Sequence, residues 1–166
     1  MTARRSLVVD TSSLILLRDA PKPDRRRVLD HLDGLILLDE LCFPVEVARE
    51  LGEQEDSDIH EWAKANQKTA GLGLNTWKLL PEVLRQVPLL VDPHKTEGEE
   101  ADGHILAMAL HLKGAGVLPT VLTEDRRDQI TDTKRLKKMS LQSACGVLEV
   151  YSIGLWAYLH NKGLLK

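Results

Sequence analysis

The chain of 166 residues is poor in cysteine and has no long apolar run. Its two cysteines, Cys42 and Cys145, do not form the Cys-x-x-Cys pair of a metal site, so we expect reduced, structural thiols in a cytoplasmic protein. The apolar runs are too short to cross a membrane, and the basic residues 1–5 are not followed by the cleavage pattern of a signal peptide. These absences argue against a membrane protein and against a secreted domain held by disulfides.

Excess positive charge is also missing, because the net charge is −3 and many nucleic-acid-binding proteins are strongly basic. Basic residues are nevertheless clustered in two places. The cluster at 25–27 is typical of a solvated helix face. The cluster at 126–138 follows a candidate active-site acid, and we predict phosphate contacts from four of its side chains, Arg126, Arg127, Lys134 and Arg135.

Length and hydropathy patterning predict a single domain over residues 1–166. Apolar runs that suit buried strands alternate with segments of helical spacing, which favours a three-layer α/β/α fold with a central, mostly parallel sheet of four or five strands. A helical hairpin is expected as an insertion at about 53–87, with an exposed apolar face suited to a homodimer interface. The predicted core strands are 7–10, 35–38, 120–123 and 147–151, with a weaker extended segment at 88–91.

The segment 7–14 carries the first candidate site residue, Asp10. Two valines lead into Asp10, and the hydroxyl residues Thr11 and Ser12 follow, which predicts a buried parallel strand that turns into a helix. The carboxyl ends of strands in an open α/β sheet form the edge where ligands bind. Asp10 is therefore placed to hold a cation, although it could instead only cap the following helix.

Three further acids lie in similar settings. Glu50 is near the end of a predicted helix, Asp102 is at the start of another, and Asp125 comes just after the strand 120–123. If the first and third core strands are neighbours, Asp10 and Asp125 share one crevice, and the helix that opens at Asp102 can aim that residue into it.

Two of these assignments have alternatives. Glu46 lies one turn before Glu50 and is its rival as the helix acid, and Asp102 could be a plain N-cap, because Asp is a preferred cap. We expect His104, within the first turn of the same helix as Asp102, to face solvent or a partner.

Several carboxylates cannot stay ionised close together in a low-dielectric pocket without a cation. Ligands that offer only oxygen suit Mg²⁺ or Mn²⁺ and not zinc. The chemistry that such a site serves best is phosphodiester hydrolysis, in which a metal lowers the pKa of a bound water and orients it.

The chain resembles a PIN domain, a nuclease fold found in toxins of toxin–antitoxin pairs, in RNA-processing enzymes and in a prokaryotic subgroup of uncertain role. The resemblance covers nearly the whole chain and depends on four motifs in order, at residues 8–14, 43–51, 101–109 and 121–125. It implies that the metal-binding and catalytic acids are Asp10, Glu50, Asp102 and Asp125. It also implies supporting positions at Thr11, Ser12 and Thr123, with nearby acids at Glu99, Glu124 and Asp128.

The resemblance implies a Mg²⁺- or Mn²⁺-dependent endoribonuclease that cuts RNA. If the chain is a toxin, a small antitoxin protein would block its acidic groove. A non-catalytic PIN-like module that binds a regulator or dimerises is the alternative. A phosphatase or phosphotransferase that forms an aspartyl-phosphate is a third hypothesis, but Ser12 stands where most such enzymes need a second Asp.

Overall fold

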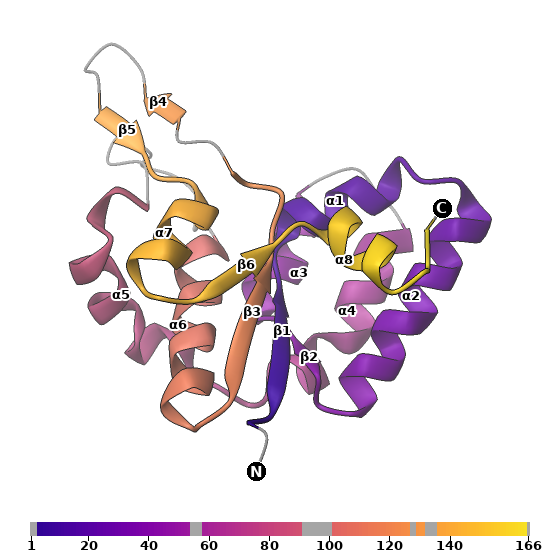
Figure 1. Cartoon of the computed structure of the whole chain (residues 1–166), viewed down its shortest axis with the longest axis horizontal. Helices are drawn as coiled ribbons and strands as arrows, with labels where there is room; N and C mark the ends of the chain where they lie inside the picture. The colour runs from indigo at the N-terminus through magenta and orange to yellow at the C-terminus, as the bar shows by residue number, and fades with distance from the viewer. Residues whose placement is uncertain (1–2, 54–57, 91–100, 127–128, 132–135, 166) are drawn as a thin grey trace.

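A central sheet of four parallel strands organises the chain, and the computed structural model describes residues 3–53, 58–90, 101–126, 129–131 and 136–165. The strand order is β2-β1-β3-β6 (Figure 1). In the register Leu7 lies opposite Leu41, Val8 opposite Val121, and Leu122 opposite Ile153. The strands are β1 (Arg5–Val9), β2 (Leu41–Cys42), β3 (Leu118–Leu122) and β6 (Tyr151–Ile153).

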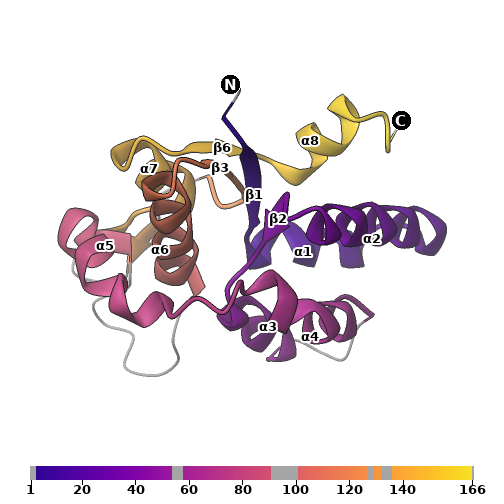
Figure 2. The same ribbon diagram turned by 90° about the horizontal axis from the view of Figure 1, so that it is seen from below.

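Helices cover both faces of the sheet, so the predicted three-layer α/β/α fold with a parallel sheet is confirmed. Figure 2 shows α5, α6 and α7 on one side of the sheet and α1, α2, α4 and α8 on the other. A separate antiparallel pair, β4 (Gln129–Thr131) with β5 (Leu136–Lys138), projects from the carboxyl end of the sheet (Figure 1). The helices are α1 (Thr11–Arg18), α2 (Lys22–Leu37), α3 (Val45–Gly52), α4 (Asp58–Ala70), α5 (Leu80–Gln86), α6 (Ala101–Gly114), α7 (Leu141–Val147) and α8 (Leu155–Asn161), with 3₁₀ turns η1 (Thr76–Lys78) and η2 (Pro88–Leu90).

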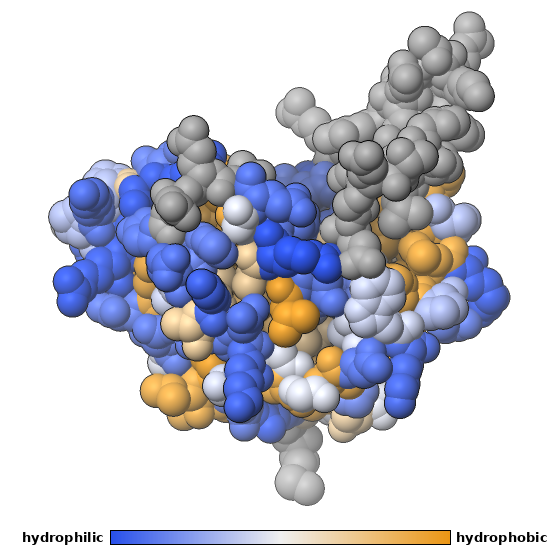
Figure 3. All heavy atoms as spheres, turned by 180° about the vertical axis from the view of Figure 1, so that it is seen from behind, coloured by the Kyte–Doolittle hydropathy of each residue, from blue (hydrophilic) through white to orange (hydrophobic). Residues whose placement is uncertain are grey.

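Helix α6 is the most deeply buried helix, because nearly all of its first nine residues are inaccessible to solvent. It packs against β3, β1 and α5. Gly103 permits the close approach of α5, because a Cβ at this position would collide with the Leu80 side chain. On the outside, Figure 3 shows a face that is mainly hydrophilic, with small apolar patches between the polar residues. In the described part of the chain, no helix has both the length and the apolar character needed to span a bilayer.

The predicted strand at 35–38 is wrong. Helix α2 continues through Gly34 to Leu37, and the strand that pairs with β1 comes later, at Leu41–Cys42. Leu37 is 82% exposed, so the apolar run is not a buried strand. A run of four apolar residues fits a helix or a strand equally well, because periodicity cannot distinguish the two over so short a length.

The expected hairpin at 53–87 is also corrected by the described residues. Helix α4 packs against α3 and α2, whereas α5 packs against α6, and Figure 2 shows α4 and α5 on opposite sides of the sheet. The two helices therefore extend two different layers of the fold.

Two further strand predictions are corrected: the weak segment at 88–91 is wrong over its described residues, and the last strand is displaced. Residues Pro88–Leu90 form a 3₁₀ turn, and the last strand begins only at Tyr151. Helix α7 occupies the residues before it, and Ser140 caps this helix by accepting a hydrogen bond from the Ser143 amide. The sequence signal for α7 was this serine, because serine is a favoured N-cap.

Candidate functional site

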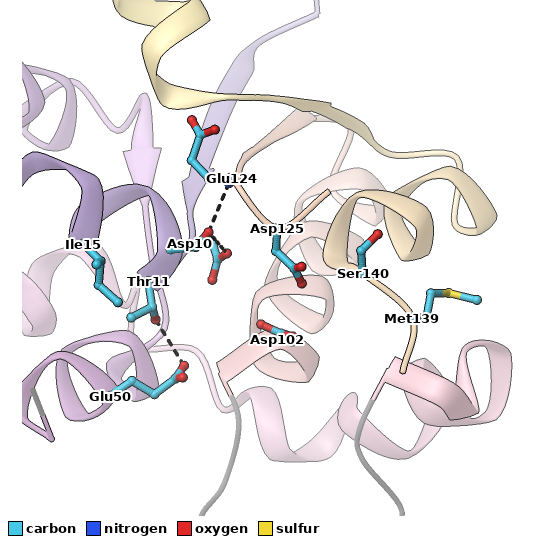
Figure 4. A pocket seen from close by; sticks show the side chains of 10 residues that line it. Asp10, Thr11, Ile15, Glu50, Asp102, Glu124, Asp125, Met139 and Ser140 are labelled. Atoms are coloured by element: carbon cyan, nitrogen blue, oxygen red, sulfur yellow. Dashed lines mark hydrogen bonds between the residues drawn. The ribbon is translucent and has the colours of Figure 1, made fainter. Parts of the chain in front are cut away.

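The four predicted acids line one cavity of about 340 Å³ at the carboxyl end of the sheet. Figure 4 shows the side chains of Asp10, Asp102 and Asp125 directed toward a common space, with Glu50 across from them. These acids come from the ends of β1 and β3, from α3 and from the first turn of α6. The remaining lining residues are Thr11, Ser12, Ile15, Glu124, Met139 and Ser140.

Asp10 is held in place by two hydroxyl groups. The Ser12 hydroxyl donates to Asp10 Oδ2 at 2.6 Å, and the Thr123 hydroxyl donates to the same oxygen at 2.8 Å. Asp10 occupies the N-cap position of α1, but its side chain makes no capping hydrogen bond there. The alternative that Asp10 only caps the helix is therefore wrong, and its predicted neighbours Ser12 and Thr123 do contact it.

Burial raises the pKa values of Asp10 and Cys145, two groups at or near this cavity. Asp10 is only 2% exposed, and desolvation raises its pKa. The hydrogen bonds from Ser12 and Thr123 oppose that rise, while the charge of Asp125 adds to it. The nearby Cys145 thiol has its pKa raised to about 12, chiefly by burial and then by the charges of Asp10 and Asp102. Negative charge thus accumulates where the aqueous solvent is partly excluded.

Asp125 is oriented by helix α7. The Leu141 amide, at the start of α7, donates to Asp125 Oδ2 at 2.9 Å, and the Gln142 amide donates to the Asp125 carbonyl at 3.0 Å. The Asp125 amide in turn donates to the Thr123 hydroxyl at 3.0 Å. Thr123 therefore links Asp10 and Asp125, as expected if β1 and β3 are neighbours.

Glu50 connects three helices. Its Oε1 accepts from the Thr11 hydroxyl at 3.1 Å and from the Ala101 amide at 2.9 Å. These contacts join α3 to the start of α1 and to the start of α6. Asp102 is the second residue of α6, so it is not the cap residue of this helix. Its carboxylate faces the cavity from the first helical turn (Figure 4).

Glu46, the rival of Glu50, is buried elsewhere. Its Oε1 lies 3.7 Å from His104 Nδ1, and His104 Nδ1 lies 2.7 Å from the Thr76 hydroxyl. His104 is 1% exposed and packs edge-on against Trp77, so the expectation that it faces solvent or a partner is wrong. Of the two glutamates on α3, only Glu50 lines the cavity.

The donor chemistry of the site fits Mg²⁺ or Mn²⁺, because carboxylate and hydroxyl oxygens dominate its polar lining. The spacing is wider than that of a preformed chelate. Among the described residues, no three His, Cys, Asp or Glu side chains are close enough together to hold an ion as they stand. The acids thus surround a shared space without converging on one point, and side-chain movement would be needed for them to share a cation.

Several predicted residues lie outside the described part of the chain. They are the supporting acids Glu99 and Asp128 and the basic residues Arg127, Lys134 and Arg135. Their assigned roles stay predictions. Sequence reasoning missed Ile15, Met139 and Ser140, which line the cavity. Of these, only Ser140 had a signal, its place as an N-cap.

No family model, no curated protein and no solved structure matches this chain. The resemblance to PIN domains accordingly depends on the four motifs alone.

Proposed function

We propose that this chain is a divalent-metal-dependent nuclease of the PIN-domain type that hydrolyses RNA phosphodiesters. The observation that supports this most directly is the cavity at the carboxyl end of the sheet, which four carboxylates from separate elements line. A fold needs a reason to gather like charges in a partly buried place, because their repulsion and desolvation oppose folding. A bound cation, which offsets the charge of the carboxylates, supplies that reason.

In this proposal Asp10, Asp102 and Asp125 hold Mg²⁺ or Mn²⁺. When bound, the ion supplies an activated water and offsets the charge of the phosphodiester. The hydroxyl groups of Ser12 and Thr123 fix the Asp10 carboxylate, so that little reorganisation of this group is needed when substrate arrives. Glu50, tethered by Thr11 and the Ala101 amide, faces the same space and is placed to orient the attacking water or a second ion.

The partners follow from the same site. A single-stranded or structured RNA would present its phosphates to the cavity. In the toxin form of the proposal, a small antitoxin protein covers the cavity in the cytoplasm, and the chain acts as a homodimer.

Cleavage of an end-labelled single-stranded RNA, with Mn²⁺ or with a chelator, tests the proposal. We expect the wild-type chain to cut only with the metal, and Asp10→Asn to remove cleavage while the fold stays intact by circular dichroism. Asp39→Asn is the matched control, because Asp39 is exposed at the amino end of the sheet and its positive φ of 54° is one that asparagine tolerates.

Full cleavage by a folded Asp10→Asn variant would overturn the assignment of the site. A wild-type chain that binds Mn²⁺ without cutting RNA would instead favour the non-catalytic module.

A further inference from the structure

A second cavity, of about 180 Å³, lies beside the acidic one where β3 and β6 end. Thr123 lines this second cavity, and its hydroxyl also donates to Asp10 in the first. A hydrogen bond from Thr123 therefore connects the lining of the second cavity to Asp10 in the first. The other lining residues are Arg126, Gln142, Ser152, Ile153, Gly154 and Ala157.

Gly154 makes room for the Arg126 side chain. Its backbone angles, φ −71° and ψ 147°, suit any residue, so no turn requires a glycine here. A Cβ at this position, however, would collide with Arg126 Nη2 and would lie 2.8 Å from Arg126 Cζ. The guanidinium thus lies against the bare backbone of Gly154, and a larger residue would displace it.

Glu124 also contacts Arg126 and, like it, lies close to Gly154. Its Oε2 lies 3.6 Å from Arg126 Nη2, and Figure 4 shows the Glu124 side chain pointing away from Asp10, Asp102 and Asp125. Glu124 therefore lines the edge of the first cavity while its carboxylate is directed to Arg126 and away from the other acids. The pair is half-exposed and long, so its attraction is weak enough to yield to a stronger anion.

The lining of the second cavity suits an anion rich in oxygen acceptors. Arg126 supplies a cation with 44% of its side chain exposed, and Ser152 and Gln142 add neutral donors. No carboxylate is among the described residues that line this cavity. A planar guanidinium binds a phosphate through two parallel hydrogen bonds, which makes arginine the preferred partner of this group.

We propose that this second cavity binds a backbone phosphate of the nucleic-acid strand, next to the phosphodiester held in the acidic cavity. The inference rests on the proposed nuclease function and assigns Arg126, positioned by Gly154 and Glu124, as the phosphate-binding residue. A strand that spans the two cavities would then have one phosphate at the acids and a neighbouring one at the arginine.

Binding of a fluorescent single-stranded RNA oligonucleotide, measured over a range of salt concentrations, tests this site. The measurement uses Asp10→Asn protein with Mg²⁺, so that the strand stays intact. The slope of log K against log salt is negative, and loss of one phosphate contact makes it shallower by about 0.7 for a single strand. We expect that change for Arg126→Gln and none for Arg26→Gln, a matched charge change at an exposed position on α2.

A second variant separates position from charge. Gly154→Ala keeps the net charge but displaces the guanidinium, so we expect it to reproduce the slope of Arg126→Gln. Equal slopes for Arg126→Gln and Arg26→Gln, or no RNA binding by the parent protein, would overturn the phosphate site.

The outcome for the site can be told apart from that for the nuclease proposal. Wild-type cleavage with equal slopes would remove only the phosphate site, whereas the expected slope change without wild-type cleavage would remove only the nuclease activity.

Discussion

Carboxylates at the two ends of the same sheet differ in their burial and in their partners. At the carboxyl end, the four predicted acids and Glu124 line a cavity of about 340 Å³, and Asp10 is buried there. At the amino end, a cavity of about 190 Å³ has a single acid, Asp39, which pairs with Arg4 at 3.5 Å while both side chains stay largely exposed. An exposed, paired acid of this kind contributes little to stability and needs no further explanation. A group of partly buried acids does need an explanation when the described residues that line their cavity include no cation.

Helix α6 connects the two ends, because Asp102 in its first turn lines the acidic cavity and Leu112 in its last turn lines the other. Its two histidines differ in the same way as the acids. His104 is buried beside Thr76 and Glu46, whereas His111 is exposed. The polar group in the first turn of α6, at the carboxyl end of the sheet, is thus buried and specifically bonded, whereas the one near the last turn is exposed to solvent. Three experiments test this contrast.

The largest effect is expected from the two histidines. His104→Ala should destabilise the fold, because each buried polar group left without its partner, here Thr76 and Glu46, costs about 1–3 kcal/mol. His111→Ala should change the free energy of unfolding by no more than about 0.5 kcal/mol. Urea denaturation measures both values. Equal effects would show that the His104 network contributes nothing special.

The next effect is stabilisation by a divalent ion. Mn²⁺ at a hundred times its dissociation constant should stabilise the wild-type chain by about 2.7 kcal/mol, since it binds only the folded state. Asp102→Asn should lose most of this gain and Asp39→Asn should keep it, as thermal denaturation with and without Mn²⁺ would show. If the two variants respond alike, the acidic cavity is not where the ion binds.

The smallest effect concerns pH in the absence of divalent ions. Because burial raises the pKa of Asp10 above its ordinary value of 3.8, the stability linked to this group is complete below that pH and is lost as pH rises through the raised pKa. Asp10→Asn avoids this loss, so its stability relative to wild type should be greatest near neutral pH and shrink on acidification. Urea denaturation at several pH values checks this. A difference that grows toward acid pH would contradict the raised pKa.

Much of the framework was predictable from short-range patterns. The valines before Asp10 and the apolar run before Asp125 indicated the strands β1 and β3, and both strands are present as neighbours. The apolar spacing after Asp102 likewise indicated α6. These patterns are informative because a buried strand or helix must present apolar residues at its own period, whatever else surrounds it.

The predictions failed where the local pattern was ambiguous. The run at 35–38 fits either a strand or the end of a helix, and only the pairing of Leu41 with Leu7 decides between them. Nothing in the order of residues showed that α4 and α5 would lie on opposite sides of the sheet.

Residue patterns and motifs indicated the fold class, the strands that end at Asp10 and just before Asp125, and the four acids that share a cavity. The packing of the elements decided that β1 and β3 are neighbours and that Glu50, not Glu46, faces this cavity. It also decided that α7 orients Asp125 and that Gly154 leaves room for Arg126. The physical reason is that residue type and spacing set which side chains can be polar or buried, whereas the direction of each side chain depends on which elements pack against it.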